Sequence, residues 1–278
     1  MIEILKAILF GIVEGITEWL PVSSTGHMIL LDEFIKLGVS KDFKELFEVV
    51  IQLGAILAVV LVYFKTIWPF EKKKEKIVLS KKVLNLWGKI LVACVPAAVL
   101  GLLLDDFLDE HLYTPVVVAI ALIVYGIVFI VLENMRKGKK EKKGQTINDI
   151  TYSQALKVGC FQLLALIPGT SRSGSTIIGG LLLGLNRSVI TEFTFLVAIP
   201  VMAGASLLKV VKYVAEFGLA FTGLEIGILL VACVVAFVVS MFVIRMMINY
   251  IKTHDFKIFG YYRIALGIVV LLYFLIIK

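Results

Sequence analysis

Six long apolar stretches constrain this chain more than any other feature of its sequence. An α-helix rises about 1.5 Å per residue, so about 20 residues cross the roughly 30 Å of a bilayer interior. Unpaired backbone groups find no water there, and each stretch is therefore expected to be a helix. The six stretches lie at residues 49–64, 84–104, 114–134, 190–210, 220–244 and 258–277. They predict one all-α polytopic membrane domain that covers residues 1–278.

Composition supports this assignment and argues against a nucleic-acid-binding protein. Apolar residues make up 60% of the 278 residues, against about 45–50% in soluble domains. The net charge of +7 could suit nucleic acid. However, the basic residues gather in short runs between apolar blocks, where they act as topology signals. We therefore expect membrane lipid, and no nucleic acid, around this protein.

Two further apolar regions are interrupted. Residues 2–35 are broken at 21–26, and residues 154–186 are broken at 168–174, in both cases by Pro, Gly and Ser. The apolar pieces of the second region are each too short to span, which favours a re-entrant helical hairpin. Residues 2–20 could almost span alone, but the similar turn favours the same shape. Irregular backbone at membrane depth requires a protein or wet surround.

Loop charge predicts the orientation. Residues 65–82 contain seven Lys against two Glu, and residues 136–143 contain six Lys or Arg against one Glu. The turn at residues 105–110 is acidic. Because basic loops stay in the cytoplasm, we expect both basic loops inside, and the acidic turn and both termini outside.

This topology divides the chain into two similar units of opposite orientation. Residues 1–134 and residues 150–278 each hold one hairpin and three spans, the plan of an inverted repeat. The sequence Trp19-Leu20-Pro21 parallels Leu166-Ile167-Pro168, with a Ser/Thr/Gly turn after each. A chance likeness between apolar segments is the alternative.

Glu14 and Glu18 are spaced to share one helix face. Two carboxylates this close in an apolar setting need a shared proton, a divalent cation or a guanidinium. We therefore mark both as candidate catalytic residues and candidate metal ligands. A wet helix end is the alternative explanation.

The first turn carries Ser23, Ser24, Thr25 and His27. Hydroxyl side chains before an apolar stretch are typical helix caps, and that is their simplest role. A helix N-terminus with free N–H groups also binds phosphate, and His27 could act as nucleophile, general acid or general base. We select Ser24 and His27 as catalytic candidates and Ser23 and Thr25 as phosphate-binding candidates.

The second turn places Arg172 among hydroxyl side chains. A guanidinium inside the bilayer costs several kcal/mol unless an anion meets it, and phosphate meets it bidentately. Arg172 is therefore a catalytic candidate, and with Ser171, Ser173 and Thr176 it forms a candidate phosphate site. The alternative is a structural pair between Arg172 and one of the acids. Both readings predict that the two turns touch.

Around these turns the chain resembles the undecaprenyl-diphosphate phosphatase family, also called the bacitracin-resistance phosphatases. The matching motifs are residues 14–27 (EGITEWLPVSSTGH) and 168–176 (PGTSRSGST). Residues 48–55 and 192–196 also look like family segments, and the resemblance covers nearly the whole chain. Glu48, in the third of these segments, is expected to support the site from behind.

The resemblance implies an enzyme of the bacterial inner membrane. It implies hydrolysis of a polyprenyl diphosphate lipid, undecaprenyl diphosphate, to undecaprenyl phosphate and inorganic phosphate. This step recycles the lipid carrier of cell-wall synthesis and confers bacitracin tolerance. A divalent cation, Mg²⁺ or Ca²⁺, is implied as cofactor. The oligomeric state stays open, with a homodimer among the options.

Several alternatives remain at this level. The attacking group is Ser24, activated by Glu18 or His27, or His27 itself, or a water molecule. A lipid-phosphate flippase or anion transporter with a phosphate site at the midplane is the competing function, because an inverted repeat also suits alternating access. A transporter needs the basic site but has no need of the acids and His27.

Overall fold

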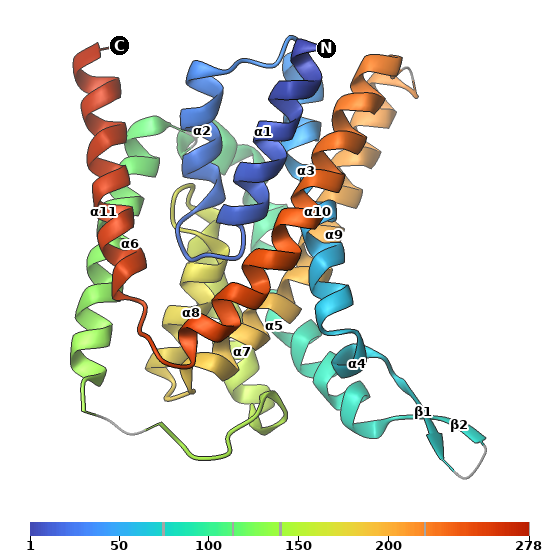
Figure 1. Ribbon diagram of the computed structural model, residues 1–278, viewed down its shortest axis with the longest axis vertical. Helices are drawn as coiled ribbons and strands as arrows, with labels where there is room; N and C mark the ends of the chain where they lie inside the picture. Colours follow the sequence, from blue (N-terminus) through green and yellow to red (C-terminus); the bar gives the residue numbers. More distant parts are fainter. Residues whose placement is uncertain (74–75, 113, 139–140, 220, 278) are drawn as a thin grey trace.

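The computed structural model is a bundle of tilted helices with both termini at the same end (Figure 1). It describes residues 1–73, 76–112, 114–138, 141–219 and 221–277, and the side chains of residues 105–111 and 277 fall outside that description. The prediction of an acidic turn at residues 105–110 is wrong, because the backbone of these residues continues the helix that spans Lys81–Leu112.

Helices make up most of the described chain. In order, the helices are α1 (Ile2–Thr17), α2 (Ser24–Phe34), α3 (Lys41–Val62), α4 (Phe64–Ile67), α5 (Lys81–Leu112), α6 (Pro115–Arg136), α7 (Tyr152–Gln162), α8 (Arg172–Leu182), α9 (Arg187–Phe217), α10 (Gly223–Ile251) and α11 (Lys257–Leu272). Short helical turns lie at η1 (Ile147–Asp149), η2 (Leu163–Leu166) and η3 (Tyr273–Ile277).

The prediction of a multi-pass membrane protein is confirmed. Within the described residues, six helices are long and apolar enough to cross a membrane, namely those at Lys41–Val62, Lys81–Leu104, Pro115–Arg136, Arg187–Phe217, Gly223–Ile251 and Lys257–Ile276. Several begin earlier or end later than the apolar stretches because polar caps set their ends. Ser40, for example, accepts a hydrogen bond from the N–H of Phe43 and starts α3, well before the apolar run.

The all-α fold class is confirmed, and the described residues add one small element that the sequence did not predict. The basic segment 65–82 contains a two-stranded antiparallel sheet of β1 (Phe70–Lys73) and β2 (Lys76–Leu79). Phe70 pairs with Leu79 across the two strands. Phe70 begins β1, and Ile77, Val78 and Leu79 follow one another in β2. Aromatic and β-branched residues favour a strand, but a run this short among lysines does not stand out in hydropathy. The hairpin projects from the lower end of the bundle (Figure 1).

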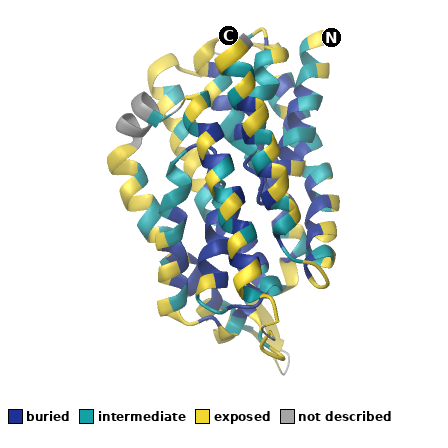
Figure 2. Ribbon diagram, turned by 90° about the vertical axis from the view of Figure 1, so that its left-hand side faces the viewer, coloured by how far each residue is buried: buried dark blue, intermediate teal, exposed yellow. Residues whose placement is uncertain are grey.

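The two interrupted regions form pairs of short helices. α1 and α2 occupy the upper half of the bundle as drawn, and α7 and α8 occupy the lower half (Figure 1). Their turns, residues 18–23 and 163–171, approach one another near mid-height. Buried residues concentrate in the interior around them, and exposed residues cover the outside of the bundle (Figure 2).

Long helices pack around these hairpins in close pairs. α6 lies along α11, α1 along α10, α7 along α5, and α3 contacts both α9 and α10. Glycines permit the closest approaches, as is common between membrane helices. A Cβ added at Gly54 of α3 would lie 2.1 Å from the Cys233 carbonyl oxygen of α10, and one at Gly126 of α6 would lie 2.7 Å from the Gly260 carbonyl oxygen of α11.

This packing predicts that Gly54→Ala destabilises the bundle. The new methyl group would overlap backbone, which cannot yield as a side chain can, and α3 must move away from α10. Overpacking of this kind costs about 1–3 kcal/mol, so the thermal unfolding midpoint in detergent should fall. Gly227→Ala is the matched control, because its Cβ would meet only Ile4 Cδ1 at 3.6 Å. Equal midpoints for the two variants would contradict this account of the contact.

Candidate active site

Each turn ends in a serine that caps the following helix in the same unusual backbone conformation. Ser23 has φ 70° and Ser171 has φ 73°, and the structure has no other non-glycine residue with positive φ among those it describes. The Ser23 Oγ accepts from the Gly26 N–H at 3.3 Å, and the Ser171 Oγ accepts from the Gly174 N–H at 3.1 Å. The two caps make Ser24 and Arg172 the first residues of α2 and α8.

This correspondence corrects the pairing of the two turns by one residue. Matching Pro21 with Pro168 would set Ser23 opposite Thr170, yet the equivalent cap is Ser171. The extra residue of the second turn follows Pro168 at Gly169, which has φ +90°. A Cβ at Gly169 would lie 2.5 Å from the Val118 carbonyl oxygen, so only glycine fits the tighter path.

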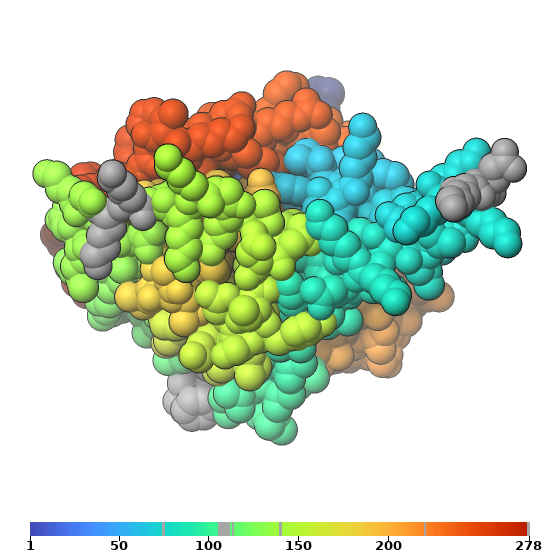
Figure 3. Space-filling model, turned by 90° about the horizontal axis from the view of Figure 1, so that it is seen from below, coloured from blue at the N-terminus to red at the C-terminus, as the bar shows by residue number. Residues whose placement is uncertain are grey.

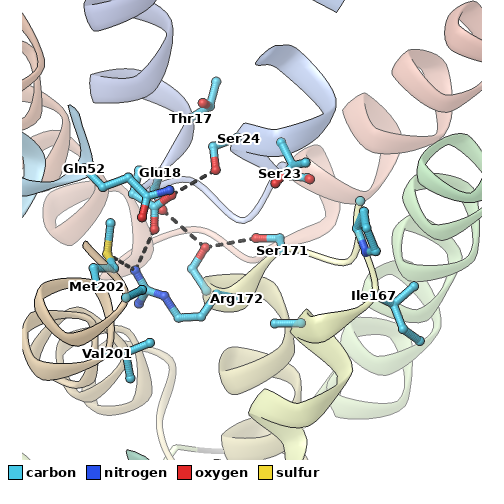
Figure 4. Close-up of a pocket in the computed structure, with 16 residues that line it drawn as sticks. Thr17, Glu18, Ser23, Ser24, Gln52, Ile167, Ser171, Arg172, Val201 and Met202 are labelled. Atoms are coloured by element: carbon cyan, nitrogen blue, oxygen red, sulfur yellow. Dashed lines mark hydrogen bonds and ion pairs between the residues drawn. The ribbon is translucent and has the colours of Figure 1, made fainter. Parts of the chain in front are cut away.

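The two turns enclose a cavity of about 170 Å³. α3 contributes Gln52 to its wall, and α9 contributes Val201, Met202 and Ala205. Most of the wall comes from the two turns and their flanking residues: Thr17, Glu18, Ser23, Ser24, Thr25, Ala165, Ile167, Pro168, Gly169, Ser171, Arg172 and Ser173. The predicted contact between the turns is therefore present, and polar side chains of both turns face one space (Figure 4).

Arg172 is the cation of this cavity. Its Nη2 donates to Glu18 Oε1 at 2.7 Å and contacts Met202 Sδ at 3.2 Å, and its Nη1 donates to the Thr194 carbonyl oxygen at 2.9 Å. Its Nε is buried without a hydrogen-bond partner, and its guanidinium carbon lies 6.0 Å from the centre of the Trp19 ring. The guanidinium is thus fixed in place and keeps one free donor.

Glu18 connects the two turns. Its Oε2 accepts a hydrogen bond from Ser24 Oγ at 2.9 Å, while its Oε1 holds Arg172. The side chains of Glu18 and Arg172 are only 8% and 12% exposed, so the pair is largely shielded from water. The line Ser24–Glu18–Arg172 crosses the cavity from one turn to the other (Figure 4).

Most of the predicted hydroxyl residues also face the cavity. Ser23, Thr25, Ser171 and Ser173 all line it, and the Ser171 and Ser173 hydroxyl oxygens lie 3.1 Å apart. Thr176 does not line it. Its Oγ1 donates to backbone carbonyl oxygens of its own helix. The same oxygen lies 2.9 Å from Thr194 Oγ1, and this contact joins α8 to α9.

The structure places three of the predicted residues behind the cavity wall. Glu14 is 1% exposed, and its Oε1 has no hydrogen-bond partner. Glu48 lies on α3 with an oxygen 3.7 Å from Lys44 Nζ. His27 lies one turn into α2, where its Nδ1 is 2.7 Å from the Ser23 carbonyl oxygen and its Nε2 is 2.6 Å from Tyr262 Oη.

Two residues at the site have no role in the predictions from sequence. Gln52 lines the cavity from α3, and Arg263 reaches both turns from α11. Arg263 is 0% exposed and donates to the carbonyl oxygens of Pro21, Gly169 and Thr170. The available signal was an arginine in the middle of the predicted span 258–277, which is a costly position for a charge.

The described residues contain no group of three or more His, Cys, Asp or Glu side chains able to hold a metal ion. Of the two candidate ligands, Glu18 lines the cavity, whereas Glu14 lies behind its wall with one free buried oxygen. Mg²⁺ commonly binds through one or two carboxylates and completes its shell with phosphate oxygens and water. Glu18 therefore fits an ion that arrives with its substrate, Glu14 could join it only from behind the wall, and the two do not form a complete protein cage.

The whole arrangement is suited to an anion with several oxygens. Two helix N-termini, a guanidinium and six hydroxyl side chains converge on one cavity, and each of these features attracts phosphate. A carboxylate that accepts a hydrogen bond from a serine hydroxyl adds the means to move a proton. The site can therefore bind a phosphate group and also react with it.

The strained caps lead to a prediction about stability. Positive φ costs a non-glycine residue about 1–3 kcal/mol, and a serine cap contributes about 1 kcal/mol. Ser171→Ala keeps the strain and loses the cap, so it should lower the thermal unfolding midpoint. Ser171→Gly releases the strain and loses only a few tenths of a kcal/mol of capping, so its midpoint should match or exceed that of the unmodified protein. A higher midpoint for the alanine variant would contradict the assigned backbone conformation.

Comparisons with known proteins agree with the motifs. Residues 7–269 match the family described as bacitracin resistance protein BacA. An undecaprenyl-diphosphatase of Enterococcus faecalis is 57% identical over 98% of this chain and 97% of its own length. One from Desulfitobacterium hafniense is 57% identical over 99% and 97%, and undecaprenyl-diphosphatase 1 of Clostridioides difficile is 56% identical over 100% and 98%. The chain belongs to the bacitracin resistance protein BacA family.

Proposed function

We propose that this protein hydrolyses undecaprenyl diphosphate to undecaprenyl phosphate and inorganic phosphate. The observation that carries the proposal is the line Ser24–Glu18–Arg172, which joins two helix N-termini across one cavity. The near-full-length relatives named undecaprenyl-diphosphatase support the substrate. The reaction returns the lipid carrier to cell-wall synthesis and confers bacitracin tolerance.

Arg172 binds the terminal phosphate in this mechanism. Its planar fork matches two phosphate oxygens, and its free Nε already lacks a partner. Ser171 and Ser173 add hydroxyl donors, and the N–H groups at the starts of α2 and α8 complete the cradle. These groups stabilise the charge on the transferred phosphoryl group, where most of the catalysis of such reactions arises.

Ser24 is the attacking group that the geometry favours. It lines the cavity, and its hydroxyl already donates to Glu18. Its Oγ attacks the terminal phosphorus while the hydroxyl proton passes to Glu18, and the bond from that phosphorus to the bridging oxygen breaks. Undecaprenyl phosphate leaves with the bridging oxygen. Water then hydrolyses the phosphoserine, releases inorganic phosphate and restores Ser24.

His27 has a supporting role in this scheme. It does not line the cavity, and both ring nitrogens are engaged, one by the Ser23 carbonyl oxygen and one by the Tyr262 hydroxyl. It therefore braces the first turn against α11. Glu48 likewise acts from a distance, through its place on α3 beside Lys44.

A divalent cation, Mg²⁺ or Ca²⁺, is part of the proposal. Glu14 and Glu18 are the residues that would hold it. When bound, it would neutralise charge on the diphosphate. Glu14 has an oxygen without a partner but lies behind the cavity wall, whereas Glu18 lines the cavity with both oxygens engaged.

In the proposed placement the protein lies in the bacterial inner membrane with its basic loops, 65–82 and 136–143, in the cytoplasm and its termini outside. Both loops lie at the lower end of the bundle, which Figure 3 views directly. That end carries the surplus of lysine and arginine, as cytoplasmic faces do.

Within this placement the hairpins α1–α2 and α7–α8 are re-entrant, from opposite faces. Residues 1–134 and 150–278 form an inverted repeat, supported by the matching caps at Ser23 and Ser171. The packing also supports it, because α1 lies along α10 of the other unit and α7 lies along α5. Both hairpins place their turns at the shared cavity, a common position for binding sites in such repeats.

Transport of a phosphate-bearing lipid or anion is the competing function, and one assay separates the two. Purified protein in detergent is mixed with undecaprenyl diphosphate, and inorganic phosphate is measured. A phosphatase releases one phosphate per lipid consumed, and a transporter releases none.

Arg172→Lys should abolish most of this activity. A lysine ammonium keeps the positive charge but cannot replace the bidentate fork, so we expect kcat/KM to fall at least about a hundredfold. The measurement is phosphate release by folded protein, checked by its unfolding midpoint. Near-normal release would remove Arg172 from the phosphate cradle.

Ser24→Ala and His27→Gln distinguish the candidate nucleophiles. Loss of the attacking hydroxyl should reduce kcat about a thousandfold or more. Loss of a brace outside the cavity should cost about tenfold or less, because glutamine still offers a donor and an acceptor. Single-turnover assays with phosphate-labelled lipid measure both variants. The reverse order of losses would make His27 the nucleophile.

Chelation tests the cation. Removal of divalent ions by a chelator should reduce phosphate release, and Mg²⁺ or Ca²⁺ should restore it. Glu14→Gln should raise the cation concentration needed for half-maximal rate about tenfold or more, because a neutral amide is a weaker ligand. Full activity in the presence of the chelator would exclude a required cation.

A further inference from the structure

Arg263 lies in the middle of α11, a helix that the reaction scheme above does not use, yet it contacts both catalytic turns. Its Nη1 donates to the Pro21 carbonyl oxygen at 3.2 Å, and its Nη2 donates to the carbonyl oxygens of Gly169 and Thr170 at 2.9 and 2.8 Å. Pro21 belongs to the first turn, and the other two acceptors belong to the second. One guanidinium therefore joins the two halves of the cavity wall.

Burial of the Arg263 guanidinium is energetically unfavourable. It is 0% exposed, and among the described residues all its hydrogen bonds go to backbone carbonyl oxygens, with no carboxylate partner. The ring of Tyr125 lies 5.7 Å from its guanidinium carbon and offers a cation–π contact. A buried charge without a counter-ion costs several kcal/mol, and packing alone could be met by an apolar side chain.

The carbonyl oxygens that Arg263 binds belong to the two turns that form the cavity. Gly169 lines the cavity, and Pro21 and Thr170 lie in the turns that form it. Ser173 also bridges to the first turn, through the carbonyl oxygens of Glu18 and Leu20, but both distances are 3.4 Å. The bonds from Arg263 are shorter and hold three carbonyl oxygens at once, so Arg263, together with the Glu18–Arg172 ion pair, sets the separation of the turns.

We propose that Arg263 is a positioning residue of the phosphatase reaction, which holds the two turns so that Ser24 and Arg172 face the same phosphate. The proposal rests on the proposed function. Ser24 is the first residue of α2 and Arg172 is the first residue of α8. A change in the spacing of the turns therefore moves nucleophile and cradle apart, and misplacement by about 1 Å costs about a hundredfold in rate.

Arg263→Lys tests the bridge while it retains the charge. A single ammonium cannot reach three acceptors on two turns in the same plane. We expect kcat to fall at least about tenfold and KM to change less than about threefold, as for an interaction needed mainly in the transition state. Arg136→Lys is the matched control, because Arg136 also donates to carbonyl oxygens, those of Leu181 and Leu185, away from the cavity. Its kcat should stay within about twofold of the unmodified value.

Gly174→Ala displaces Arg263 without removing it and guards against a misfolded Arg263 variant. A Cβ at Gly174 would lie 2.9 Å from Arg263 Nη1, so the guanidinium must shift. Alanine is the better helix former, and α8 should remain intact. We expect a lower kcat in this variant, with Gly227→Ala unaffected. In a double-mutant cycle, Gly174→Ala should reduce kcat much less when residue 263 is already lysine.

The outcomes separate clearly. Loss of kcat in folded Arg263→Lys, with coupling to Gly174→Ala, supports the positioning role. A normal kcat in folded Arg263→Lys overturns it. So does a Gly174→Ala substitution that reduces kcat equally whether residue 263 is arginine or lysine. A lower unfolding midpoint with normal kcat below that midpoint makes Arg263 purely structural. Absence of phosphate release from the unmodified protein would instead contradict the proposed function.

Discussion

The polar turns of α1–α2 and α7–α8 are stable inside an apolar bundle because each turn provides hydrogen-bond and charge partners for the other. Two breaks in helices leave backbone N–H and C=O groups without partners inside their own helices. Glu18 of the first turn neutralises Arg172 of the second, and Ser173 and Arg263 bind carbonyl oxygens of the first turn. The cavity and its chemistry follow from this mutual satisfaction.

The same interactions prepare the site for its substrate. Arg172 is held by Glu18 and by a carbonyl oxygen before any phosphate arrives, so little side-chain freedom remains to be lost on binding. In the proposed mechanism the phosphate takes over Arg172, and Glu18 is then free to receive the proton of Ser24. The Glu18–Arg172 ion pair thus holds both the cation that binds phosphate and the base that accepts the proton, in one place that is largely shielded from water.

The sequence was sufficient for the six spans, the two interrupted regions and the contact between their turns. Hydropathy and the cost of a buried arginine carry those conclusions, and both are local properties. The β1–β2 hairpin was missed because two four-residue strands among lysines leave no mark on hydropathy. The equivalence of the cap residues Ser23 and Ser171 was missed because the second turn has one extra residue, and only the backbone angles show that it lies at Gly169.

The site residues show a similar limit. Glu18 and Arg172 could be selected because a charged side chain is costly in a bilayer, and Ser24 because a helix N-terminus with hydroxyl side chains binds phosphate. His27 was selected for its acid–base chemistry beside these groups, yet its ring lies behind the cavity against Tyr262, and nothing in the spacing of α2 reveals which face it takes. Arg263 carried the same signal as Arg172 but stood in an unbroken span. Its role depends on α11 packing beside two turns that are distant in sequence.

The central claim is that two distant turns act as one catalytic unit. The most direct test is a double-mutant cycle between them, with Ser24→Ala and Arg172→Lys made singly and together, and single-turnover hydrolysis of labelled undecaprenyl diphosphate measured for each. Residues of one catalytic unit are strongly non-additive. The account predicts that the double variant is within about threefold of the slower single variant. Losses that multiply would mean that the two turns act independently and would contradict the account.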